Sequence, residues 1–184
     1  MEKQYQNIHQ FLIDQCRQGD QKAQFEIYRL YYKSMYNVSL RIVNDESEAE
    51  DIMQEAFLKA FRKINTYRGE VGFGAWLKRI VVNRSLDYLK RKKVHFEDLT
   101  SLSTLIPDDS ESYNEVNVEN IKEAIRKLPD NYRIVLSLYL IEGFDHDEIS
   151  QILGISNPAS RTQYSRAKSK LRELLKGKEI IQYN

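Results

Sequence analysis

The chain has little of what several protein classes depend on. A single cysteine, Cys16, cannot form an internal disulfide, which excludes a disulfide-stapled fold and suits a reducing compartment. The three histidines, His9, His95 and His146, lie far apart and lack the spacing of a zinc site. Seven glycines and three prolines among 184 residues are few, which favours helices over a turn-rich β architecture. The sequence therefore predicts a helical fold with no bound metal.

Membrane and catalytic signals are also missing. No apolar run approaches the roughly 18 residues that a membrane span needs, and the N-terminal residues MEKQYQNIHQ do not resemble a signal peptide. We therefore expect a cytoplasmic protein with no membrane insertion. The sequence has no phosphate-binding glycine loop, no carboxylate cluster with a metal-site pattern and no nucleophile paired with a base. It predicts a protein that is not an enzyme and needs no cofactor.

Charge is strongly segregated, although the net charge is only +1. Residues 45–55 hold six acids and residues 94–120 hold seven, and neither stretch contains a Lys or Arg. Residues 59–93 instead carry eleven Lys and Arg against two acids, and residues 154–178 carry seven against one. Blocks of opposite sign indicate several charged surfaces with different partners.

Aromatic side chains are interleaved with the first basic block, between Arg68 and Lys93. A single strand with splayed bases needs both features, because bases stack on rings while cations replace the phosphate counterions. The block therefore suggests melted nucleic acid. Phe73 and Trp76, at positions i and i+3, are also typical of a helix core, so Tyr67 in the adjoining loop is the better stacking candidate. The cations at 90–93 also fit an ordinary solvated helix end.

Periodicity predicts four helices in the first half. Asp20 caps one that carries an apolar stripe of Ala23, Ile27, Leu30 and Tyr31. Another follows residues 44–47 and continues to Ile64, residues 68–72 form a loop, and a further helix spans about 73–92. A short segment around residues 11–13 is the fourth helix.

The second half begins after an acidic, serine-containing stretch that is typical of a linker. Helices are expected near 118–127, 131–141, 145–153 and 157–175, which makes the whole chain all-α. Gly154 forms a turn between the last two and Ser156 caps the last, a helix-turn-helix pattern. Tyr164, Ala167 and Leu171 face the core, which leaves Arg161, Thr162, Ser165 and Arg166 outside as candidate major-groove contacts. Helical hairpins with glycine turns also occur in bundles that bind no DNA.

Two stretches in this order resemble one family closely. The resemblance is carried by SEAEDIMQEAFLKAFRKINTYRGEVGFGAWLKRIVVNRSLDYLKRKK, the acidic linker and LPDNYRIVLSLYLIEGFDHDEISQILGIS. The chain resembles an extracytoplasmic-function, or group IV, sigma factor of bacterial RNA polymerase. The resemblance implies sigma region 2 within residues 1–93, a flexible linker at 94–118 and region 4 within 119–184. It also implies a promoter-specificity subunit whose partners are core RNA polymerase and promoter DNA, with an anti-sigma factor as a further candidate partner.

The resemblance also implies roles for individual residues. The clamp helices of the polymerase β′ subunit would contact Glu50, Asp51, Gln54, Glu55 and Leu58, and the β flap would contact the second domain. The −10 element, with an extruded base, would be framed by Lys59, Lys63, Tyr67, Phe73, Trp76, Lys78, Arg79, Asn83 and Arg84. The −35 element would be contacted by Ser156, Asn157, Arg161, Thr162, Ser165, Arg166 and Lys170.

The chain departs from the family pattern at two places. Gly74 stands where a larger side chain is usual, and Pro158, Ala159 and Ser160 replace a more usual Gly, Thr and Val. Pro158 also lacks an N–H that a phosphate could accept. An alternative hypothesis from another class is a stand-alone helix-turn-helix regulator, which would bind duplex operators without polymerase.

Overall fold

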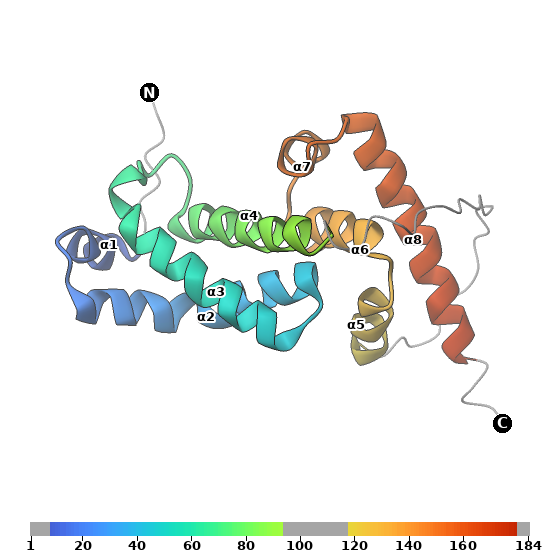
Figure 1. Cartoon of the computed structure of the whole chain (residues 1–184), viewed down its shortest axis with the longest axis horizontal. Coiled ribbons are helices and arrows are strands. Elements are labelled where there is room, and N and C mark those ends of the chain that lie inside the picture. Colours follow the sequence, from blue (N-terminus) through green and yellow to red (C-terminus); the bar gives the residue numbers. More distant parts are fainter. Residues whose placement is uncertain (1–7, 94–117, 180–184) are drawn as a thin grey trace. The chain divides into compact units, whose positions relative to one another are not determined.

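The computed structural model describes residues 8–93 and 118–179, and within these ranges every regular element is a helix (Figure 1). This confirms the all-α prediction. The chain divides into two compact units, Met1–His95 (unit 1) and Phe96–Asn184 (unit 2). The predicted linker lies outside the described residues except for Val118, which begins a helix.

Within residues 8–93, unit 1 contains four α-helices and a short 3₁₀ turn, η1. Their bounds are α1 Gln10–Arg17, α2 Gln21–Val43, α3 Glu46–Arg62, η1 Ile64–Thr66 and α4 Phe73–Lys93. The prediction that the second long helix continues to Ile64 is wrong by two residues, because α3 ends at Arg62. The backbone there tightens, because Thr66 N–H donates to Lys63 O and Tyr67 N–H donates to Ile64 O.

Helix starts in unit 1 follow from capping residues. Asp20 Oδ1 accepts from the backbone N–H groups of Lys22 and Ala23, at 2.7 and 3.2 Å, as predicted. Asp45 Oδ1 accepts from Glu48 N–H at 3.1 Å and starts α3. These caps fix where α2 and α3 begin, and therefore which of their side chains face inward.

The core of unit 1 forms where α2, α3 and α4 pack on one another (Figure 1). Its largest fully buried side chains are Ile13, Ile27, Met35, Val38, Ile42, Met53, Phe73, Leu77 and Val81. Leu30 is exposed, so its predicted place on the buried stripe is wrong. The side chains of α2 that face the core include buried Ile27 and Met35 and half-buried Tyr31. Leu30 lies outside this row on the helix surface.

Unit 2 has its own small core. Its elements are α5 Val118–Arg126, α6 Asp130–Leu136, the π-helical segment η2 Ser137–Ile141, α7 His146–Leu153 and α8 Asn157–Glu179. Ile125, Leu128, Leu136 and Ala167 are buried together, with Tyr164 and Leu171 packed against them as predicted. The single helix expected over 131–141 changes its winding at Ser137.

The helix-turn-helix geometry of α7 and α8 is present. Asp145 and Glu148 form a reciprocal capping box at the start of α7, and Gly154 ends it with a left-handed φ of 68°. Ser156 Oγ accepts from Ala159 N–H at 3.2 Å, which confirms its predicted cap on α8. Since the turn is closed by these local contacts, the direction in which α8 leaves α7 is fixed.

Candidate functional site

The outer face of α3 is acidic. Glu50, Asp51, Gln54 and Glu55 are exposed, and Leu58 adds an apolar side chain that is 56% exposed. The opposite face buries Ile52, Met53, Ala56 and Phe57 in the core. All five residues predicted to contact a protein partner therefore share one solvent-facing side of a single rigid helix.

The outer face of α4 is basic and polar. Trp76, Arg79 and Asn83, at positions i, i+3 and i+7, lie on one side, where Arg79 and Asn83 are exposed and Trp76 is half-buried. Lys59, Lys78 and Arg84 are half-buried, whereas Lys63 is exposed. The structure thus places the predicted cations on α4 and at the end of α3, where Lys63 is the C-cap residue.

Glu55 and Arg84 link the two predicted surfaces through an ion pair between Glu55 Oε2 and Arg84 Nη2. The sequence assigned these two residues to different partners. Because each partly neutralises the other, neither belongs wholly to the acidic or the basic surface.

Tyr67, Phe73 and Trp76 form an aromatic cluster. The ring centroids of each pair lie 5.4 Å apart. Tyr67 is only 3% exposed and Phe73 only 1%, so the interpretation of Tyr67 as the better stacking surface is wrong. Its position in a loop suggested exposure, but burial of the ring against its neighbours outweighs this. Of the three, only Trp76 is not buried, and it is half-buried.

Tyr31 explains the unusual Gly74. A Cβ at position 74 would lie 3.0 Å from Tyr31 Cε1, and the Tyr31 ring packs on Phe73 at a centroid distance of 5.6 Å. Tyr31 therefore fills the space that a larger side chain at position 74 would need. The sequence analysis missed this role, since nothing local connects residues 31 and 74.

The outer face of α8 carries the predicted DNA contacts. Arg161, Thr162, Ser165 and Arg166 are all exposed, as expected. Arg161 Nε donates to Asn157 Oδ1 at 2.8 Å, and Asn157 Nδ2 donates to Asp147 Oδ1 at 2.6 Å. Arg161 is thus held in place by a chain of contacts that reaches α7.

The remaining members of this predicted set differ in their surroundings. Ser156 is exposed, and Asn157 is half-buried within the chain of contacts just described. Lys170 is half-buried and pairs with Glu173 at 2.7 Å. Lys170 is therefore the least available cation of the set.

His146 is a buried polar residue that the sequence analysis did not single out. Its Nδ1 lies 2.9 Å from Ser160 Oγ. Its ring stacks on Tyr139 at 4.5 Å and meets the edge of Tyr164 at 5.7 Å. The contact joins α7 to α8, so it gives the unusual Ser160 a structural partner.

Neither a metal site nor a membrane span is found among the residues that the structure describes. Within 8–93 and 118–179, no three His, Cys, Asp or Glu side chains are grouped so as to hold a metal ion. No helix in those ranges is both long and apolar enough to cross a bilayer.

Comparison with known proteins identifies the two units. Residues 27–94 match the family described as Sigma-70 region 2, and residues 119–171 match Sigma-70, region 4. The ECF RNA polymerase sigma factor SigW of Bacillus subtilis is 33% identical over 178 residues, which cover 89% of this chain and 95% of that protein. The ECF RNA polymerase sigma-E factor of Haemophilus influenzae is 28% identical over 182 residues, 92% of this chain and 94% of the relative.

A solved structure shares the fold. The sigma factor RpoE of Bartonella quintana, in complex with the anti-sigma factor NepR, superposes with a TM-score of 0.58 at 22% identity. The superposition covers 82% of this chain and 95% of that one.

The chain belongs to the ECF sigma factors of RNA polymerase. Sigma factors are non-catalytic initiation factors that bind core polymerase and promoter DNA, and this chain is a promoter-specificity subunit. The alternative of a stand-alone duplex-binding regulator is not favoured, because the matches include region 2 as well as the helix-turn-helix region.

Proposed function

We propose that unit 1 binds core polymerase through α3 and the −10 element through α4, while unit 2 binds the −35 element through α8. The observation that carries the proposal is the opposite charge of two adjoining helices of unit 1, α3 acidic and α4 basic on their exposed faces. Opposite charges favour different partners, since each face attracts one sign and repels the other.

The polymerase contact is assigned to Glu50, Asp51, Gln54 and Leu58, with Glu55 at its edge. Exposed carboxylates suit a basic partner surface, which we take to be the β′ clamp helices. Leu58 supplies an apolar anchor of the kind that contributes most to interface affinity. Glu55 contributes less directly, because Arg84 already pairs with it.

The −10 contact is assigned to the outer face of α4 together with Lys59 and Lys63. An extruded base stacks on Trp76, which is half-buried, and Arg79 and Asn83 lie beside it on the same side of the helix. Tyr67 and Phe73 contribute indirectly, because their buried rings pack on Trp76 and hold it in place.

The −35 contact is assigned to Arg161, Thr162, Ser165 and Arg166, with Ser156, Asn157 and Lys170 at its borders. An exposed helix face with two arginines suits the major groove, where Arg binds guanine through two hydrogen bonds. We also propose that unit 2 contacts the β flap and that the protein works in the cytoplasm without catalytic activity.

An anti-sigma factor is a further proposed partner. Support comes from the solved relative named above, which was captured with one.

Promoter melting tests the −10 assignment. Asn83→Ala should slow open-complex formation, because losing a hydrogen bond to the extruded base weakens the capture that offsets an unpairing cost of a few kcal/mol. Asn37→Ala, on the exposed side of α2, is the matched control. Permanganate footprinting should show weaker thymine reactivity for Asn83→Ala on paired DNA and partial rescue on a template mismatched across the −10 element. Reactivity equal to that of the control on paired DNA would remove Asn83 from this site.

A further inference from the structure

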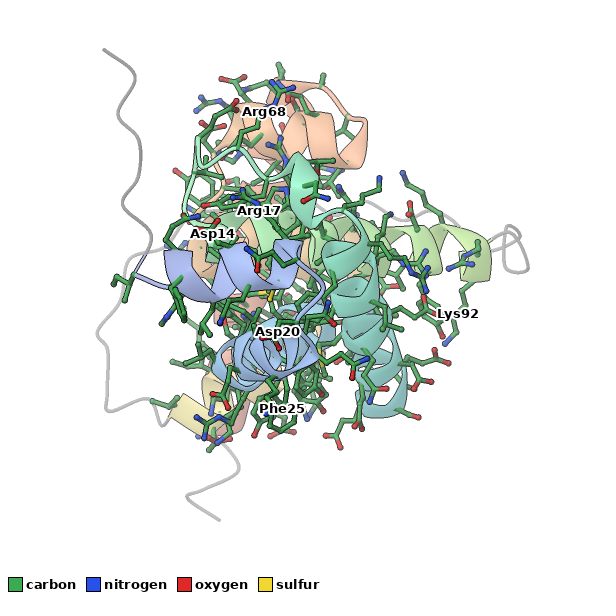
Figure 2. The ribbon with its side chains drawn as sticks, turned by 90° about the vertical axis from the view of Figure 1, so that its left-hand side faces the viewer. Asp14, Arg17, Asp20, Phe25, Arg68 and Lys92 are labelled. Atoms are coloured by element: carbon green, nitrogen blue, oxygen red, sulfur yellow. The ribbon has the colours of Figure 1, made fainter. Side chains whose placement is uncertain are left out.

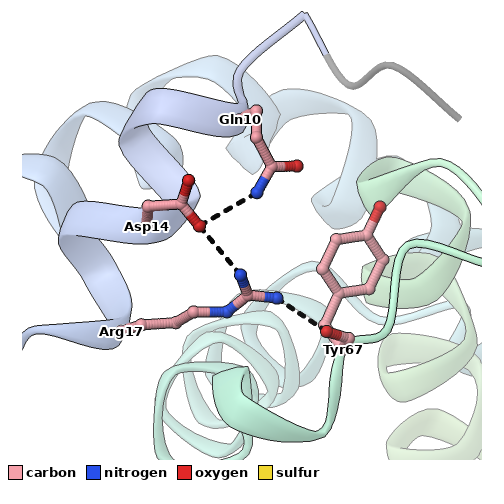
Figure 3. A network of polar contacts seen from close by, with 4 residues as sticks. All are labelled: Gln10, Asp14, Arg17 and Tyr67. Atoms are coloured by element: carbon pink, nitrogen blue, oxygen red, sulfur yellow. Dashed lines mark hydrogen bonds and ion pairs between the residues drawn. The ribbon is translucent and has the colours of Figure 1, made fainter. Parts of the chain in front are cut away.

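A polar network ties α1 to the loop between η1 and α4 (Figure 3). Arg17 Nη2 donates to the backbone oxygen of Tyr67 at 2.7 Å, and Arg17 Nη1 donates to Asp14 Oδ1 at 2.8 Å. Gln10 Nε2 donates to the same Asp14 oxygen at 3.0 Å. Asp14 and Arg17 project from α1 toward the side of unit 1 where the loop with Arg68 lies (Figure 2). Arg17 is thus oriented by its own helix and directed at a distant segment.

The residue that Arg17 holds is fixed at its other end as well. The Tyr67 hydroxyl donates to Val71 O at 2.7 Å, so the tyrosine spans the loop formed by residues 68–72. Its ring lies in the cluster with Phe73 and Trp76. Displacing the Tyr67 backbone would therefore move the loop and disturb the support of Trp76 together.

The surroundings of Arg17 distinguish it from an ordinary surface arginine. Its side chain is 32% exposed, and the hydrogen bond to Tyr67 O joins residues 50 positions apart. Arg29 on α2 forms a similar i,i+3 pair with Glu26 at 2.9 Å, but its side chain is 66% exposed. A charged donor in a partly buried site contributes more than an exposed pair, because solvent competes less for it.

We propose that Arg17 is a positioning residue for −10 recognition: by holding the Tyr67 carbonyl it fixes the 68–72 loop beside Trp76. The inference rests on the proposed role of unit 1 and adds α1 to it, although α1 lies outside the residues that match region 2. Arg17 does not itself contact DNA in this account. Arg68 and Glu70 at the exposed loop tip are the groups whose placement it controls.

Hydrogen exchange tests the positioning directly in the full-length protein. Arg17→Gln should speed amide exchange across residues 67–72 about tenfold, as expected when a charge-assisted hydrogen bond is lost, and leave the amides of α3 unchanged. Arg17→Lys keeps the charge but loses the planar fork that holds Asp14 and Tyr67 O in a fixed geometry, so it should show most of the effect of Arg17→Gln. Arg29→Gln is the matched control and should have no effect on the loop. Unchanged loop exchange in both Arg17 variants would overturn the proposal.

Promoter selectivity tests the link to DNA. Polymerase carrying either Arg17 variant should lose about fivefold to tenfold of its discrimination among fragments that differ by one base in the −10 element. If Arg17 acted only through its charge, Arg17→Lys would keep the selectivity of the wild type, and that result would contradict the proposal. Faster loop exchange with unchanged selectivity would likewise overturn the link to base recognition.

Two further controls keep the outcomes distinct. Should Arg17→Gln fail to fold, Asp14→Asn provides a second variant, because it weakens the hold on Arg17 and should give a smaller effect of the same kind. If the wild-type protein itself does not discriminate among −10 sequences, the proposed function of unit 1 fails, while loop exchange still decides whether Arg17 positions the loop.

Discussion

His146 shows how one buried side chain can join the two helices of a helix-turn-helix. It accepts or donates a hydrogen bond with Ser160 while its ring is covered by Tyr139 and Tyr164. Burial, and secondly the positive charge of Arg161, lower the pKa of His146 below its ordinary value of 6.5, while Asp145 and Asp147 act in the opposite direction. The neutral imidazole is therefore the form that joins α7 to α8.

A pH dependence of unit 2 follows. The unfolded chain binds a proton at His146 near pH 6.5, whereas the folded chain does so only at lower pH, so stability falls as the pH drops below about 6.5. Thermal unfolding at pH 7.5 and 5.5 should show this loss in unit 2, and His146→Gln should reduce it. The fluorescence of Trp76, the single tryptophan, identifies the separate transition of unit 1. Equal pH dependence in wild type and His146→Gln would contradict the assignment.

Residue environments were harder to predict than residue patterns. Caps such as Asp20 and Ser156 were predictable because their hydrogen bonds are local in sequence. The burial of Tyr67 and the need for Gly74 beside Tyr31 depend on contacts between segments far apart in the chain. The contact between His146 and Ser160 likewise forms only when α7 and α8 meet. No periodicity in a single sequence contains that information.

At the scale of an element, the two faces of α3 have different roles. Its buried side holds the core, and its outer side carries the acids assigned to polymerase. The sequence predicted a charged surface over residues 45–55, and its family resemblance implied polymerase contacts for Glu50, Asp51 and Glu55. It did not predict the pairing of Glu55 with Arg84, which lies on another helix.

Charge reversal on α3 should weaken core binding. Asp51→Lys places a cation opposite a basic partner, and we expect at least about a tenfold loss of affinity, since like-charge contacts cost several kcal/mol at worst. Glu26→Lys on α2 changes the charge equally and should have little effect. Affinity for core enzyme, measured on monodisperse helical variants, provides the comparison. Wild-type affinity for Asp51→Lys would show that another face binds polymerase.

Helix α8 allows a test of base contact against phosphate contact. Arg166→Ala should cost about 1–3 kcal/mol at the preferred −35 sequence if Arg166 contacts a base, and should weaken all sequences evenly if it contacts only phosphate. Arg172→Ala, further along the same helix and also exposed, is the matched control. A library of −35 sequences transcribed with each variant separates these cases. Activity equal to wild type across the library would exclude both contacts.

At the scale of the whole molecule, we propose that the two units divide the recognition of a promoter. Each has its own buried core and its own exposed basic helix, α4 in unit 1 and α8 in unit 2. In our proposal each unit therefore binds one promoter element. Only unit 1 also carries the acidic helix that we assign to the β′ clamp helices, so loss of that helix face should abolish function even where both DNA surfaces are intact.

Transcription from defined templates tests the central claim most directly. Run-off transcription would use core polymerase with and without this protein, on genomic promoter fragments. We expect discrete transcripts only when both are present, and loss of those transcripts when either the −10 or the −35 element is altered. A protein that bound the same fragments specifically without core polymerase, and yielded no transcript with it, would contradict the account and favour a duplex-binding regulator.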